Sequence, residues 1–281
     1  MKPDREFDAF GPWILAVEEE RDVPPLFRGS FKFDDTVRLV LKIPRHITRR
    51  NARPGMDLYD HLVVIRETEI LILDRMDSGK EPRRRVAPLN DLLAVGKLTD
   101  LLLGELQLHL REESVTVPFN TISEELIDEA IGIIRENAYH EGGPGVSAGK
   151  AASDELTPLY RNLLKQERRL NGAELLAYQP SALVDKKEKT LWDRIADIYA
   201  LPLLRETMIL SNTRELILYN REPMIIRRRT GHYGYLRTLL PLSNLSAFER
   251  EANPRYSEVE DLSFVLGPRR IRCVVGESFP D

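Results

Sequence analysis

Two stretches of this chain repeat one pattern, and this repetition constrains the fold more than any other feature. Residues 88–95 and 241–248 both read Pro-Leu-x-x-Leu-x-Ala-apolar. An internal repeat indicates that one structural unit is built twice along the chain. Residues that match between the copies are therefore expected to serve the scaffold that both copies share.

The repeat extends on both sides of this motif. The other matched segments are 39–44 with 175–180, 69–75 with 215–221, 106–110 with 262–266, and positions 115, 117 and 119 with 271, 273 and 275. The offset between copies is 136 residues at Pro44, 146 at Glu69, 153 at Pro88 and 156 at Leu106. A growing offset predicts small insertions in the loops of the second copy, where extra length costs little.

Composition narrows the class of protein. The chain has 281 residues, 42% of them hydrophobic, which is typical of a soluble protein of about two domains. Its net charge is −4, with 20 basic and 26 acidic residues in the first 140 positions and 21 and 19 in the rest. Neither half is strongly basic, which disfavours a general nucleic-acid coat protein.

The single cysteine and the short apolar runs bear on location. Cys273 excludes an intramolecular disulfide and a thiolate-rich metal site, and we expect it to be a small buried side chain. The apolar runs are too short for a transmembrane helix. The charged start of the chain does not resemble a secretory signal. We therefore expect a cytoplasmic protein without a transmembrane segment.

Hydrophobic periodicity predicts strands closed by one helix in the first copy. Alternating or apolar segments predict strands at 36–43, 62–66, 70–74, 86–95, 106–110 and 115–119. Apolar residues spaced three and four apart then predict a helix over 123–137, with Ser123 as its N-cap. Residues 1–30, rich in prolines and aromatics, are expected to cover the first domain irregularly.

The second copy differs at its ends. Pro158 and Gly172 predict a helix over 158–170, followed by a strand at 174–179 and a helical insertion over 190–201. The sequence leaves no room for a closing helix after the last strand. We expect the helix at 158–170 to fill that place by packing on the second copy. The Gly-rich segment 141–153 is expected to be a flexible linker.

Residues 208–221 resemble the strand pair of bacterial pleckstrin-homology-like (PH-like) domains. In those domains, an apolar-Leu-Thr-Asn-x-Arg-x-apolar-Ile-x-Tyr line is followed by a basic turn and then by an Ile-Pro-Leu strand. Here the basic residues 227–229 and the segment 240–242 follow in the same order. The first copy matches more weakly at 63–75, and 103–108 adds a Leu-Gly-x-Leu-x-apolar line. The resemblance implies an α+β fold of two tandem PH-like domains, each a bent antiparallel sheet or partial barrel capped by a helix. It places them at 1–140 and 154–281, and it implies no enzyme.

Arginine clusters are the candidate binding residues. They are Arg45, Arg49, Arg50 and Arg53 in one loop, and the triplets Arg83, Arg84, Arg85 and Arg227, Arg228, Arg229, which precede the Pro-Leu segment in both copies. Clustered arginines bind phosphate groups of lipid headgroups or nucleotides. The alternative interpretation is a charged strand edge that prevents aggregation. No two histidines are spaced as metal ligands, and no cofactor motif is present.

Two smaller features leave other functions open. Asp57, Asp60 and His61 are close in sequence, and a carboxylate beside a histidine is a potential acid–base pair. The apolar runs 101–103 and 232–235 are candidates for exposed partner surfaces.

Taken together, these features predict a non-catalytic binding or scaffold protein that associates with protein partners or with itself. The alternative is anionic-ligand binding, at a membrane surface or on a nucleotide, through the arginines.

Overall fold

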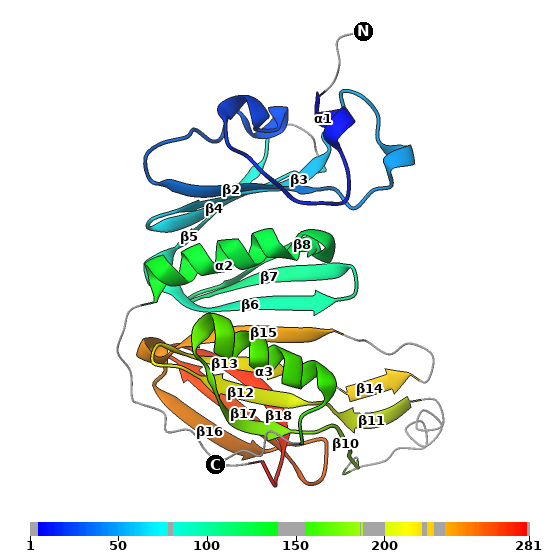
Figure 1. Ribbon diagram of the computed structural model, residues 1–281, viewed down its shortest axis with the longest axis vertical. Helices are drawn as coiled ribbons and strands as arrows, with labels where there is room; N and C mark the ends of the chain where they lie inside the picture. Colours follow the sequence, from blue (N-terminus) through cyan, green and yellow to red (C-terminus); the bar gives the residue numbers. More distant parts are fainter. Residues whose placement is uncertain are drawn as a thin grey trace. The chain divides into compact units, whose positions relative to one another are not determined.

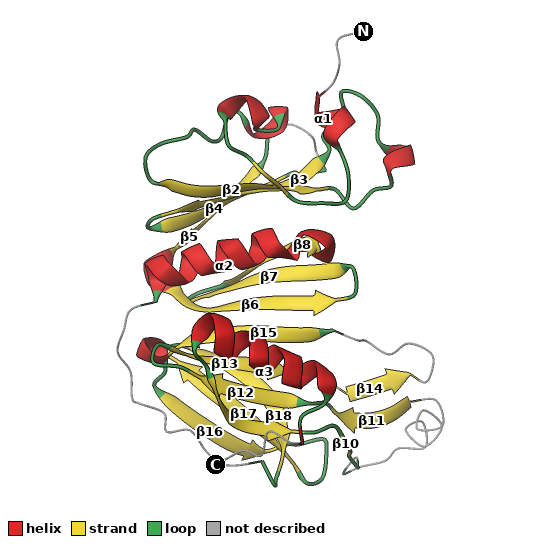
Figure 2. Cartoon of the chain, in the orientation of Figure 1, coloured by secondary structure: helices red, strands yellow, loops and turns green. Residues whose placement is uncertain are grey.

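The computed structural model describes residues 5–77, 81–139, 155–185, 187, 200–220, 224–227 and 234–279. The fold is a mixed α+β fold in which strands dominate and helices are few (Figure 2). The chain divides into two compact units. The first contains residues 1–92, 102–110 and 114–139, and the second contains 93–101, 111–113 and 140–281. The expected linker 141–153 lies outside the described residues.

One antiparallel sheet forms the centre of the first unit. Its strands, in spatial order, are β1 (Leu15–Ala16), β2 (Val37–Pro44), β3 (Tyr59–Arg66), β4 (Glu69–Asp74) and β5 (Arg83–Pro88). Strands β3 and β4 are buried along almost their whole length. Both faces of this sheet are therefore covered.

The N-terminal segment covers one face, as predicted. It contains helix α1 (Arg5–Ala9) and the short 3-10 turns η1 (Glu20–Asp22) and η2 (Pro25–Phe27). Its buried side chains form one apolar cluster with the sheet; they are Phe10, Val17, Val23, Phe27 and Phe31, packed with Val40, Leu62, Val64, Leu71 and Leu73. Figure 1 shows these turns on one side of the sheet and helix α2 (Glu124–Ala138) on the other.

The first unit continues through a hairpin into α2. The hairpin strands are β7 (Leu103–Leu110) and β8 (Ser114–Asn120), and η5 (Thr121–Ser123) joins them to the helix. The helix begins near the predicted place and buries Ile127, Ala130, Ile131 and Ile134. Ser123 does not cap it as predicted. Its Oγ instead accepts a hydrogen bond from the Ile14 N–H at 3.1 Å, and this bond fastens the N-terminal segment to the start of α2.

In the second unit, five strands follow the order β6 (Leu92–Asp100), β15 (Tyr235–Pro241), β13 (Glu215–Asn220), β12 (Thr207–Ser211) and β9 (Glu174–Gln179). All but the first residue of β6 belong to this unit, although the strand lies in the first sequence repeat. Two further sheets are present, β16 (Ala247–Ala252) with β17 (Val259–Leu266) and β18 (Arg269–Gly276), and β10 (Ala182–Leu183) with β11 (Ala200–Leu204) and β14 (Met224–Arg227).

The core of the second unit lies between β16–β18 and the sheet of β9, β12, β13 and β15. Leu216, Leu218 and Leu240 pack there with Phe264 and Val275. Cys273 lies in the same core and is buried, as predicted. The predicted helix over 190–201 is wrong at its end, because Ala200 and Leu201 belong to β11 and pair with β14. Residues 190–199 of the predicted helix lie outside the described part of the chain.

Helix α3 (Pro158–Asn171) packs on the second unit, as predicted. The Tyr160 hydroxyl donates to the Glu206 carbonyl at 3.0 Å. Glu167 is buried, and it accepts hydrogen bonds from Tyr219 and Asn171, each at 2.5 Å, while Arg237 Nε lies 2.7 Å from its carboxylate. The expected role as a substitute closing helix is wrong. Tyr219, which donates to Glu167 on α3, corresponds to Leu73 in the first repeat. Leu73 packs against the N-terminal segment. Helix α3 therefore corresponds in position to the N-terminal segment of the first unit and not to α2.

Strand registers agree between the two repeats. Glu69 faces Pro88 and Asp74 faces Arg83, while Glu215 faces Pro241 and Asn220 faces Leu236. The hairpin β7–β8 pairs Leu103 with Asn120, and β17–β18 pairs Val259 with Gly276; both members of the second pair lie 156 residues after their counterparts. The matched sequence segments therefore form matching ladders.

The repeated Pro-Leu motif makes a corner instead of the continuous strand expected at 86–95. After Pro88 the chain turns through η4 (Leu89–Asp91), and after Pro241 it turns through η7 (Leu242–Asn244). The Leu89 N–H donates to the Thr68 carbonyl and the Leu242 N–H donates to the Arg214 carbonyl, each at 2.9 Å. At each corner the chain therefore leaves the sheet that holds β5 or the ladder that β15 forms with β13. For this reason residues 86–95 do not form one continuous strand.

Candidate functional site

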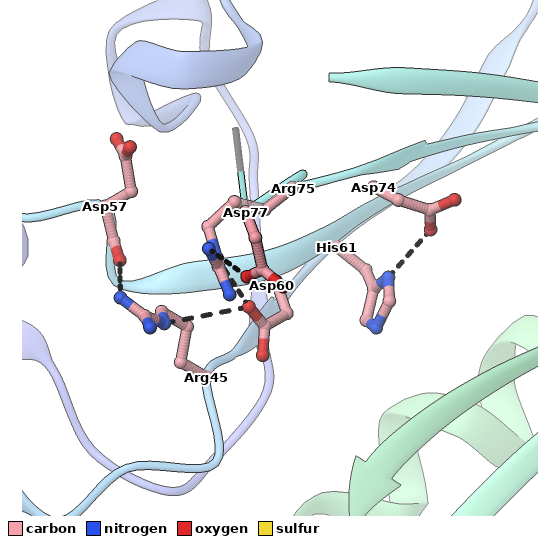
Figure 3. Close-up of polar contacts among 7 residues, drawn as sticks. All are labelled: Arg45, Asp57, Asp60, His61, Asp74, Arg75 and Asp77. Atoms are coloured by element: carbon pink, nitrogen blue, oxygen red, sulfur yellow. Dashed lines mark hydrogen bonds and ion pairs between the residues drawn. The ribbon is translucent and has the colours of Figure 1, made fainter. Parts of the chain in front are cut away.

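A partly buried triad of ionisable side chains joins three strands of the first unit. His61 on β3 faces Asp74 on β4, and Arg85 on β5 reaches the same carboxylate. The imidazole Nδ1 of His61 lies 2.8 Å from Asp74 Oδ1 (Figure 3). Arg85 donates two hydrogen bonds to the two Asp74 oxygens, at 2.7 and 2.6 Å. Such a two-point arginine–carboxylate contact fixes orientation as well as charge.

The electrostatics of the triad favour the ionised carboxylate. Burial raises the pKa of Asp74, but the hydrogen bonds from His61 and Arg85 and the charge of Arg85 outweigh it. The net pKa of Asp74 lies below its usual value of 3.8. With both oxygens bonded to its neighbours, Asp74 is suited to holding His61 and Arg85 in place.

A second charged group lies at the same end of the sheet. Arg75 Nε donates to Asp60 Oδ1 at 2.7 Å, and Arg45 Nε lies 3.7 Å from that oxygen (Figure 3). Arg75 also reaches Asp77 at 3.4 Å. Burial lowers the pKa of Arg75, but the bonds and charges of Asp60 and Asp77 more than offset this, so its pKa is raised.

The structure does not bring Asp57 or Asp60 to His61, as the potential acid–base pair would require. Asp57 offers its main-chain carbonyl to Arg45 at 3.2 Å, and its carboxylate points away (Figure 3). Asp60 pairs with arginines, and the carboxylate on His61 is Asp74, thirteen residues away. The hairpin register that pairs His61 with Asp74 was the signal that could have identified this partner.

The loop arginines divide into structural and exposed residues. Arg49, in η3 (Arg49–Asn51), donates to the carbonyls of Phe7 and Phe10 and lies over the Phe7 ring, so it fastens the N-terminal segment. Arg45 is held by Asp60. Arg50 and Arg53 are exposed, with no side-chain partner among the described residues.

The arginine triplets do not occupy equivalent places as expected. Residues 83–85 form the first half of β5, and their register counterparts are residues 236–238 on β15. Arg227 ends β14, which pairs with β11 in another sheet. Arg228 and Arg229 lie outside the described residues. The error arose because the segment between β13 and β15 carries an extra strand.

Arg83 and Arg84 are exposed, again without a side-chain partner in the described part of the chain. The described residues 45–60, 74–77 and 81–85, which lie at this end of the sheet, contain eight arginines against five Asp and Glu residues. The sheet end is therefore positive in a chain whose net charge is −4. Among the residues that the structure describes, no group of three or more His, Cys, Asp or Glu side chains could hold a metal ion.

Three segments that meet at the start of α2 carry exposed apolar side chains, and we call these side chains the leucine patch: Trp13, Leu102, Leu103 and Ile122. Their exposed fractions are 43%, 58%, 59% and 57%. The Thr121 N–H donates to the Leu102 carbonyl at 3.2 Å, and the Ile14 N–H donates to Ser123, so hydrogen bonds join the three segments that carry the patch. Leu101, in the turn before Leu102, is 70% exposed. The prediction that 101–103 is an exposed apolar run is confirmed.

Helix α2, which begins at the patch, is acidic on its solvent side. It carries Glu124, Glu125, Asp128, Glu129 and Glu136 against one basic residue, Arg135. Glu124 and Glu125 lie in the first turn, where the helix meets the leucine patch, so the patch is bordered there by acidic residues.

Comparisons with known proteins find no match. No family model, no curated protein and no solved structure is significantly similar to this chain. In the described part of the chain, no helix is both long and apolar enough to span a bilayer.

Proposed function

We propose that this chain is a non-catalytic binding module, built from two PH-like repeats, that binds a protein partner through the leucine patch. The PH-like assignment is supported by the element order of the first repeat, in which β2–β5, β6–β8 and α2 follow one another. The shared registers of the second repeat support the same assignment.

The observation that carries the proposal is the exposure of the patch. Leu102, Leu103 and Ile122 each leave more than half of their side chains in water, which no other large apolar residue described in the first unit does. Contiguous apolar surface bordered by charge is typical of protein interaction sites. Trp13 adds an aromatic side chain, the type most enriched at the energetic centre of interfaces.

The acidic border specifies the chemistry of the partner. An anionic membrane surface is disfavoured, because the carboxylates of α2 would approach lipid headgroups of the same charge. A protein surface with an apolar centre and Lys or Arg at its rim fits both features.

A photo-crosslinking experiment in the native cell tests the proposal. A photoreactive amino acid at position 102 should give an adduct of one defined mass, and the same group at exposed Glu112 should not. Leu103→Glu combined with the probe at 102 should abolish the adduct, because a charge at the centre of an apolar interface is costly. Equal labelling from positions 102 and 112 would contradict the proposal.

A second candidate function is the binding of anionic ligands by Arg50, Arg53, Arg83 and Arg84. The supporting observation is that Asp60, which is partly buried, and Asp74, which is buried, are already held by other arginines. The four exposed guanidinium groups are thus left to attract a phosphate or a lipid headgroup.

Vesicle binding tests this candidate directly. Arg50→Glu with Arg53→Glu should weaken binding to phosphatidylserine vesicles by at least about tenfold, and added salt should weaken it for the natural chain. Exposed Arg169, on α3, provides the matched control as Arg169→Glu. Inorganic phosphate in place of vesicles separates a soluble ligand from a membrane surface. Binding that is insensitive to the double change would exclude these arginines.

A further inference from the structure

The second unit contains a joint between strands of different repeats. Strand β6 pairs antiparallel with β15, with Val95 facing Leu239, Gly96 facing Thr238, Lys97 facing Arg237 and Leu98 facing Leu236. By sequence, β6 belongs to the first repeat and β15 to the second. A strand of the first repeat thus forms an antiparallel ladder with a strand of the second.

The counterparts of these two strands lack such a partner in the described part of the chain. Strand β5 matches β15 by register, and it is the last strand in its sheet. Strand β16 matches β6 through the Pro-Leu motif, and it is also the last strand in its sheet. An unpaired edge offers a row of main-chain hydrogen-bonding groups to another strand.

Burial distinguishes the paired strand from its unpaired counterpart. Val95 on β6 is 0% exposed, whereas Phe248, at the matching place on β16, is 53% exposed. Likewise Ala94 is buried, and Ala247 is exposed. The surface that is covered on β6 is therefore open on β16.

We propose that β16 of one molecule pairs antiparallel with β5 of a second copy, in the register of the β6–β15 joint. That register places Arg83 opposite Glu251, Arg85 opposite Glu249 and Val86 opposite Phe248. Arg83 and Glu251 are both exposed, without side-chain partners among the described residues. Opposite charges directly across a strand pair stabilise it.

The remaining pair has two like charges, Arg84 opposite Arg250. The internal joint has the same arrangement, since Lys97 faces Arg237 there. In each case one member already has a carboxylate partner, because Arg237 contacts Glu167, and Arg250 contacts Glu260 at 2.6 Å. In both pairs, a neighbouring carboxylate thus offsets the repulsion between the two like charges.

The contact joins two different surfaces, β5 and β16, so it is head-to-tail. Each added copy brings a further β5 and a further β16, and the copies form an open chain or a closed ring. The arginines of β5 also select the acidic edge of β16 over other strands. This surface differs from the leucine patch, so the inference does not depend on the function proposed above.

Sedimentation velocity on the full chain over a range of concentrations tests the inference. The average mass should rise above the 32.3 kDa of one chain as concentration increases. Arg83→Glu and Glu251→Arg should each weaken association by at least about tenfold, since each change sets like charges opposite one another. Mixing the two variants should restore association, because each then offers the edge that the other needs.

The mixture makes the test independent of folding, since two misfolded variants would not rescue each other. Glu112→Arg, at an exposed hairpin residue, is the charge control, and Leu102→Glu separates this contact from the leucine patch. Both should associate like the natural chain. A natural chain that stays at the mass of one copy would overturn the inference. So would single variants that assemble normally, or a mixture that fails to recover.

Discussion

One row of polar side chains differs sharply between the two repeats, although the strands that carry it are in the same register. In the first repeat the row is His61, Asp74 and Arg85. In the second, the same three places are taken by Thr207, Asn220 and Thr238. The places are polar in both repeats, but only one row is charged.

The two rows satisfy their polar atoms differently. Asp74 has hydrogen bonds to both oxygens. In the second row, Asn220 Oδ1 and Thr238 Oγ1 are buried and have no hydrogen-bond partner among the described residues. The comparison shows that this position of the sheet tolerates buried polar groups, while the stabilisation obtained from them depends on the partners that each repeat supplies.

Removing the carboxylate of the charged row should have the largest effect on stability. Asp74→Leu leaves Arg85 and His61 without their shared partner, which should lower the free energy of unfolding by about 3 kcal/mol. Urea denaturation measures the change. Asp77→Leu is the control, because Asp77 is exposed and should cost less than about 0.5 kcal/mol. Equal losses from the two changes would mean that the triad contributes nothing specific.

Acid should weaken the charged row and leave the neutral row unaffected. The pKa of Asp74 is lower in the folded chain than its usual 3.8, so folding favours the carboxylate. Its contribution is therefore complete above the usual pKa and is lost as the pH falls through the lowered pKa of the folded state. Asp74→Asn should flatten this acid dependence, measured as the urea midpoint at several pH values. Asn220→Leu should leave its slope unchanged.

In the neutral row, removing an unpaired hydroxyl should be harmless or favourable. Thr238→Val keeps the shape and removes a buried oxygen without a partner in the described part, so stability should rise by up to about 1 kcal/mol. Thermal unfolding measures the gain against Thr116→Val, an exposed strand residue. A loss greater than about 1 kcal/mol would show that the hydroxyl has a partner.

The smallest effect on stability is expected at one matched core position, where the first repeat has valine and the second has cysteine. Cys273 on β18 matches Val117 on β8, and both are buried. Cys273→Val should change stability by less than about 1 kcal/mol, because size and polarity are nearly kept. Burial raises the pKa of the Cys273 thiol to about 12, so a thiol reagent should label it only after unfolding. Rapid labelling of the folded chain would contradict its place in the core.

Much of the strand pattern could be predicted from the sequence, because the repeat gives each strand twice. Residues 69–74 and 215–220, matched in the sequence, are β4 and β13. The segments at 106–110 and 262–266 lie in β7 and β17. Continuous apolar runs identify β4 and β13, whose side chains are nearly all buried, whereas alternation identifies β7, where every second side chain is buried.

The candidate sites were harder to predict because they depend on pairing. The His61–Asp74 contact crosses a hairpin, and closeness in sequence favoured Asp57 and Asp60 instead. The role of Arg49 in holding the N-terminal segment required knowing where that segment lies. Helix α3 was assigned to the correct repeat but to the wrong face, since helical periodicity identifies the buried side and not the surface it meets.

The corner at each Pro-Leu motif is closed by peptide groups, from Leu89 to Thr68 and from Leu242 to Arg214. Side chains take no part in this bond, so the corner has the same form with Thr68 in one place and Arg214 in the other. Thr68, whose side chain is exposed, is consequently open to mutation in a way that the leucines are not. An engineer could place a fluorescent or affinity label there and leave both halves of the architecture as they are.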